Sequence, residues 1–150
     1  MSDLSDAWRI NNRINLYVID ALAEGAVMGR PAKGRTVPEM VAHLHNVRID
    51  WLKSGDPSLI GDLAKLDKAT LTQDALRQAL QGSGEAIALL IEAGETSGRI
   101  KGFKPHPAAF AAYMCAHDAY HRSEISALAT PLGHPLDKKT SFGMWEWGVR

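Results

Sequence analysis

Four long stretches of the chain place apolar residues at intervals of three and four, which is the period of one face of an α-helix. They cover residues 4–24, 36–53, 72–95 and 107–129. Glycine and proline clusters separate them, and no segment alternates apolar and polar residues as a half-buried strand does. The pattern therefore predicts an all-α fold, a four-helix bundle with long connections.

Short polar signals indicate where two of these helices begin. Thr36, Pro38 and Glu39 match the N-cap hydroxyl, the early proline and the returning carboxylate of a capping box. The helix that ends near residue 95 has two candidate caps, Thr70 and Thr72, and the sequence does not choose between them.

The connections and the tail give weaker signals. Residues 25–35 contain three glycines and a proline and are expected to form a loop. Residues 54–71 form a connection in which we expect a helical turn around 60–66. The tail is too short for another core helix, and we expect Trp145 and Trp147 to cap the bundle or to form a dimer contact, because exposed indoles favour aggregation.

Size and charge narrow the class of protein. The chain of 150 residues has the size of one domain, so we expect a single domain over residues 1–150. It carries 17 basic and 17 acidic residues with neither sign clustered, which argues against a nucleic-acid or acidic-membrane partner. Cys115 is the only cysteine, and no segment reads as a signal peptide or a membrane span. We expect a cytoplasmic protein.

The histidines are the strongest chemical signal. His117 and His121 lie four residues apart on the apolar face of the last long helix, where two imidazoles can share one metal ion. The alternative is a pair of core histidines satisfied by hydrogen bonds. His43 or His45 can supply a third ligand, but these two lie about 200° apart on the helical wheel, so only one can face the pair. Periodicity does not choose between them.

Two segments together resemble a known family. TVPEMVAHLHNVRIDWL at 36–52 and HDAYHRSEI at 117–125 resemble the DinB and YfiT-like family of four-helix metalloenzymes. The resemblance implies a divalent metal ion, nickel or zinc, held by one histidine of the second helix and by the later HxxxH pair. Aligning EMVAH with the family pattern implies that His43, His117 and His121 are the ligands. His45 is then expected to be a surface or half-buried side chain.

Other polar residues are candidates for the same site. Relatives often carry HRGQ where this chain has HRSE, and Glu124 lies on the histidine side of its helix as a possible hydrogen-bond acceptor, weak ligand or catalytic general base. Asn11 and Asn15 interrupt an apolar stripe, so they either line a substrate-binding polar pocket with Trp8 as its wall or form an interhelical hydrogen bond.

Two residues beside the histidine pair are given structural interpretations. Asp118 turns the motif into HDAYH, which is one methylene short of the HExxH of zinc peptidases and argues against that activity. We expect Asp118 to form a surface ion pair with Arg122 rather than to support a histidine. Cys115 is expected to be a small buried filler rather than a ligand.

The resemblance implies a function. Members of the family include transferases and isomerases that use low-molecular-weight thiols, so the expected partner is a small-molecule substrate, and the expected assembly is a homodimer. Three neutral imidazoles leave the full charge on the metal ion, which lowers the pKa of a thiol bound there. The alternative hypothesis is a non-enzymatic, dimeric, helical, stress-related binding protein with a structural metal.

Overall fold

The computed structural model describes residues 1–150 and is helical throughout, which confirms the predicted all-α class. Its four long helices are α1 (Asp3–Ala21), α3 (Val37–Gly55), α4 (Gln73–Ser97) and α5 (Pro107–Ala129). Two short helices, α2 (Glu24–Met28) and α6 (Lys138–Gly143), and three 3₁₀ turns, η1 (Pro57–Leu59), η2 (Lys68–Thr70) and η3 (Trp147–Val149), complete it. An isolated bridge between Ile100 and Phe103 is the only β pairing.

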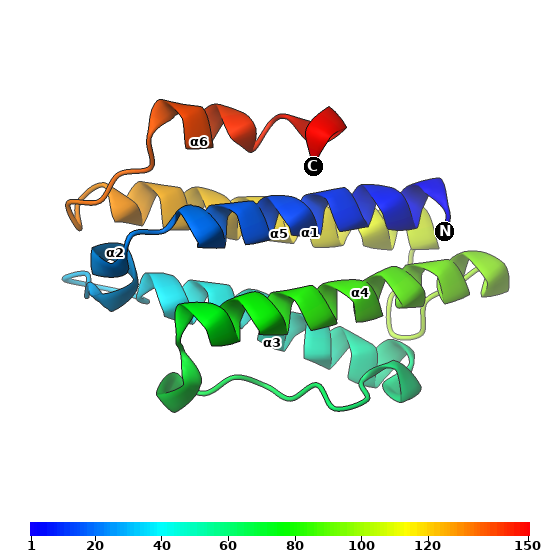
Figure 1. The fold of residues 1–150 in the computed structure, drawn as a ribbon. Helices are drawn as coiled ribbons and strands as arrows, with labels where there is room; N and C mark the ends of the chain where they lie inside the picture. The colour runs from blue at the N-terminus through cyan, green and yellow to red at the C-terminus, as the bar shows by residue number, and fades with distance from the viewer.

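The four long helices lie alongside one another (Figure 1). Helix α1 packs against α4 and α5, and α3 packs against the same two helices from the other side. The connection between α3 and α4 runs along the outside of these helices, and α6 lies over α1 and α5 (Figure 1). None of the helices combines the length and the apolar character that crossing a membrane requires.

The helix starts agree largely with the sequence. Thr36 Oγ1 accepts a hydrogen bond from the Glu39 amide at 3.2 Å, but the Glu39 side chain lies 3.6 Å from Lys68 Nζ instead of returning to the cap. Only half of the predicted capping box is therefore present. Thr72 is the cap of α4, and α5 begins at Pro107 as predicted.

The connections differ from expectation in two places. Helix α1 ends at Ala21 instead of residue 24, and residues 24–28 form the short helix α2, which takes up the start of the loop predicted at 25–35. The helical turn expected at 60–66 is absent, and turns η1 and η2 form on either side of it. Asp56 and Asp67 cause this difference, because each accepts a hydrogen bond from the backbone amide two residues ahead and so starts a turn that periodicity does not report.

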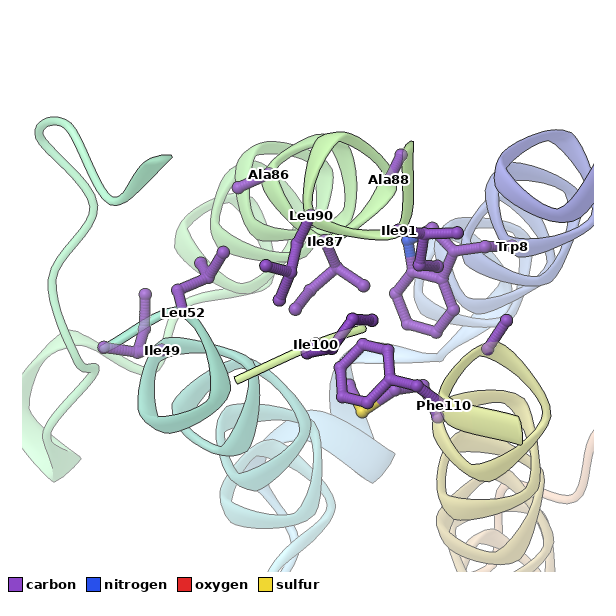
Figure 2. Packing of buried hydrophobic residues seen from close by; sticks show 12 residues of the cluster. Trp8, Ile49, Leu52, Ala86, Ile87, Ala88, Leu90, Ile91, Ile100 and Phe110 are labelled. Atoms are coloured by element: carbon purple, nitrogen blue, oxygen red, sulfur yellow. The ribbon is translucent and has the colours of Figure 1, made fainter. Parts of the chain in front are cut away.

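The core consists of two apolar clusters with polar side chains between them. One cluster surrounds Trp8, which Figure 2 shows among the apolar side chains of α4 and α5. The other includes Val18, Leu44 and Ile125. Along the helices, most of the buried polar residues fall between these clusters, among them Asn11, Asn15, Arg48, Ser83 and Asp118. This polar layer lies in the middle of the protein.

A close approach between α1 and α4 depends on Gly84. Trp8 Nε1 donates to the Gly84 carbonyl at 2.7 Å, and Asn12 Nδ2 donates to the Leu80 carbonyl at 3.0 Å. A Cβ atom at position 84 would lie 2.5 Å from Asn12 Cγ, inside van der Waals contact. The glycine in mid-helix is required by this contact, although it costs helix stability.

We predict that Gly84→Ala lowers the free energy of unfolding by about 1–2 kcal/mol, because the overlap with Asn12 outweighs the gain in helix propensity. Gly82→Ala is the matched control, since a Cβ there meets only the end of the half-buried Leu63 side chain, at 2.8 Å. Thermal unfolding followed by circular dichroism measures both. A Gly84→Ala protein as stable as Gly82→Ala would contradict the proposed close packing.

Candidate metal centre

Three imidazoles converge between α3 and α5. His43 of α3 and His117 and His121 of α5 have ring nitrogens that all lie within 4.8 Å of one another. Their ring centroids are 5.3, 4.7 and 4.6 Å apart for the pairs 43–117, 43–121 and 117–121. No further histidine, cysteine, aspartate or glutamate joins the group. The structure thus brings together the three histidines selected from the sequence.

The second candidate in α3, His45, has a structural role. It is 1% exposed, and its two ring nitrogens lie 3.1 Å from the Ala79 carbonyl oxygen and 2.7 Å from that of Ala64. The expectation of a surface or half-buried His45 is therefore wrong. Burial lowers the pKa of His45, and a neutral imidazole has a single N–H, so the ring donates to only one of these two carbonyls. Both of its nitrogens face carbonyls of α4 and of the connection before it, outside the three-histidine group.

Glu124 orients one of the three imidazoles. Its Oε1 lies 2.6 Å from His121 Nδ1, one turn away on α5. When Nδ1 carries the proton and donates to this carboxylate, the lone pair is on Nε2, which is the nitrogen left for a metal ion. Of the three roles considered for Glu124, this contact favours hydrogen-bond acceptor.

Asp118 lies beside the imidazole of His117, and the expectation that it forms a surface ion pair with Arg122 is wrong. It is fully buried rather than at the surface, and its ion-pair partner is Arg48, with Nη2 at 2.8 Å from Oδ2, rather than Arg122. The other oxygen, Oδ1, lies 3.9 Å from His117 Nδ1, beyond hydrogen-bond distance, and neither atom has another partner.

The polar residues of α1 belong to the layer around Asp118. Asn11 and Asn15 each donate to Asp118 Oδ2 at 2.8 Å and each accept from Arg122 Nη1, at 2.8 and 2.7 Å. These are the interhelical hydrogen bonds of the alternative interpretation. Trp8 is buried in the apolar core. The structure does not bring these three residues into the hollows beside the histidines.

Charge and burial set the protonation of two groups. Burial lowers the pKa of His43 to about 4, and the positive charge of Arg35 acts in the same direction, so this imidazole is neutral at pH 7. Burial alone would raise the pKa of Asp118, but the charge of Arg48 and the hydrogen bonds to the carboxylate hold it at about 2. Asp118 is therefore ionised at every physiological pH.

Two hollows open beside the histidines. One, of about 400 Å³, includes His43 in its lining, and the other, of about 450 Å³, includes His121 and Glu124. Arg35, in the segment before α3, lines both. His117 and His121 are 18% and 12% exposed, so the centre is shielded from bulk solvent and still reachable by a small molecule.

Comparison of the chain with protein-family models, with curated proteins and with solved structures finds no match. The function of the three-histidine centre is therefore inferred from its distances, burial and charges.

The sequence analysis did not identify Arg48, the buried ion-pair partner of Asp118. Arg48 follows Leu44 by four positions and precedes Leu52 by four, so it lies on the same buried face of α3. A charged residue within an apolar stripe is the sequence feature that indicates a buried ion pair.

We predict that Asp118→Asn destabilises the protein by about 3–5 kcal/mol, because it leaves the buried guanidinium of Arg48 without a counter-charge. Asp20→Asn is the control. It removes an ion pair with Arg77 whose partners are 40–50% exposed, and it should cost less than about 1 kcal/mol. Urea unfolding compares the two, and equal losses would show that the buried pair contributes no more than a surface pair.

Proposed function

We propose that His43, His117 and His121 bind one divalent metal ion, nickel or zinc, and that the protein is a metal-dependent enzyme that transfers a low-molecular-weight thiol. We also propose that its helices form the four-helix bundle of the DinB-like family. One observation carries the proposal: three imidazoles meet beside open hollows, and no fourth protein ligand joins them. Three protein ligands with an open position are typical of catalytic rather than structural zinc sites.

The donor set suits such an ion. Imidazole nitrogen is a preferred ligand of zinc and nickel. Nitrogens that share one tetrahedral ion lie about 3.3 Å apart, so binding would draw the nitrogens together by at most about 1.5 Å from their present spacing of up to 4.8 Å. Glu124 already holds His121 Nδ1, and Asp118 Oδ1 faces His117 Nδ1, which gives two of the three ligands a carboxylate that can orient them.

The thiol must come from a small molecule. Cys115 is the only thiol of the chain, it does not belong to the histidine group, and burial raises its pKa to about 11. A bound divalent cation would lower the pKa of an incoming thiol so that the thiolate is present at pH 7. The sulfur then attacks an electrophilic carbon, a C–S bond forms, the leaving group departs with its electron pair, and the thiol proton passes to solvent.

The charged residues around the hollow beside His121 favour an anionic substrate. Lys33 and Arg35 line the hollow beside His121, and Glu124, the acidic group there, is engaged with the histidine. Their positive charges would attract the thiolate and any carboxylate carried by either reactant. Positioning by Arg35 and orientation of the ligands are the contributions that this chain itself makes to the reaction.

We predict that the protein binds one zinc or nickel ion per chain and that His43→Ala, His117→Ala and His121→Ala each abolish this binding. His45→Gln is the control, because its ring faces two carbonyls outside the group and its loss should leave the stoichiometry at one. Metal analysis after dialysis, with circular dichroism to verify folding, gives the result. Loss of metal in folded His45→Gln with retention in His43→Ala would contradict the assignment.

We predict that metal-loaded protein accelerates the reaction of glutathione or cysteine with 1-chloro-2,4-dinitrobenzene, and that His121→Ala does not. The reason is that only the bound cation keeps the thiol ionised at neutral pH. Absorbance of the thioether product measures the rate. Equal rates for metal-loaded protein, metal-free protein and His121→Ala with every thiol would remove thiol transfer and leave the non-enzymatic binding protein as the better description.

A further inference from the structure

A cavity separate from the two hollows lies on the other side of α5, beneath the C-terminal segment. Its volume is about 570 Å³, which is within the range of small-molecule sites. Its walls are mostly apolar and come from the tail and from α5: Met144, Trp145, Trp147, Cys115, Ala116 and Ala119. On the helical wheel Ala119 and Cys115 lie nearly opposite His117, so this cavity is separate from the metal centre.

Arg122 brings an unbalanced positive charge to the polar side of this cavity. The carboxylate that acts on it, Asp118, is already paired with Arg48, so two guanidiniums share one carboxylate. Burial lowers the pKa of Arg122 more than the charge of Asp118 raises it, yet a guanidinium remains charged at pH 7. An anion beside Arg122 would balance this charge.

The hydrogen-bond donors of Arg122 are only partly used. Nη1 donates to Asn11 and Asn15, whereas Nε and Nη2 have no protein acceptor. Neither atom is fully buried, in contrast to Arg48 Nε, which is buried without a partner. Arg122 is one of the residues that line the cavity. Ser126 Oγ also belongs to a lining residue and is buried without a partner. The cavity therefore combines apolar walls with unused donors at one side.

We propose that this cavity binds a small organic carboxylate, whose apolar body packs against Trp145 and Trp147 and whose carboxylate pairs with Arg122. The indole of Trp145 is 81% exposed, and a flat apolar ligand would cover it. The free Nε and Nη2 donors match the two oxygens of a carboxylate. This site is independent of the proposed metal ion, because it uses none of the histidines.

Isothermal titration calorimetry with 2-naphthoate tests the site, and 2-naphthamide is the uncharged control of equal shape. We expect 2-naphthoate to bind the wild-type protein at least about tenfold more tightly than 2-naphthamide, because only the acid pairs with the guanidinium. Arg122→Gln should weaken 2-naphthoate about tenfold. Arg99→Gln, which removes an exposed arginine beyond the end of α4, should leave the affinity unchanged.

Two further variants distinguish binding in this cavity from binding at the metal centre. Ala119→Trp changes an exposed lining residue, fills the cavity without touching the polar layer and should abolish binding even if Arg122→Gln fails to fold. His121→Ala should keep the affinity for 2-naphthoate, since the ligand does not use the metal centre.

The proposal is overturned if 2-naphthamide binds as tightly as 2-naphthoate, if Ala119→Trp binds 2-naphthoate normally, or if His121→Ala alone removes binding. It is also overturned if sedimentation shows a dimer that Trp145→Ala dissociates, because a second copy would then occupy the cavity.

Discussion

The buried ion pair between Arg48 and Asp118 is the constraint on which the rest of the structure depends. Both side chains are fully buried, so each charge needs its partner and its hydrogen bonds. Arg48 Nη1 also donates to the Leu80 carbonyl and to Ser83 of α4, and Asn11 and Asn15 of α1 donate to Asp118. All four long helices meet in this layer. A shift of one helix along its neighbours would leave a buried charge unpaired, which is how the layer selects the register.

The same layer supports the proposed metal centre. Asp118 precedes His121 by three positions and follows His117 directly, so the ion pair that holds α5 against α3 also places both imidazoles opposite His43. The carboxylate itself faces His117 across 3.9 Å. Stability and site geometry are therefore linked, because the group that stabilises the helix contact also stands behind a ligand.

Helix α5 carries two different chemical environments on its two sides. On one side His117 and His121 face His43 beside charged hollows, and on the other Arg122 faces a cavity walled by the tryptophans of the tail. Hydrogen bonds through Asn11 and Asn15 connect Arg122 to Asp118 and so join the two sides. The C-terminal segment lies outside the four long helices, and its side chains supply one wall of this cavity.

The sequence by itself determined the helices and the histidine pair, because both depend on local spacing. Apolar periodicity and cap residues act within a few positions, which is why the start of α5 at Pro107 was predicted. Only the tertiary structure decided that Asp118 is buried, because its ion-pair partner Arg48 lies 70 residues away in the sequence. The same holds for His45, because the two carbonyls that its ring faces belong to other segments of the chain. Periodicity left His43 and His45 equivalent, since a helical wheel describes one helix, whereas the three-histidine group lies between α3 and α5.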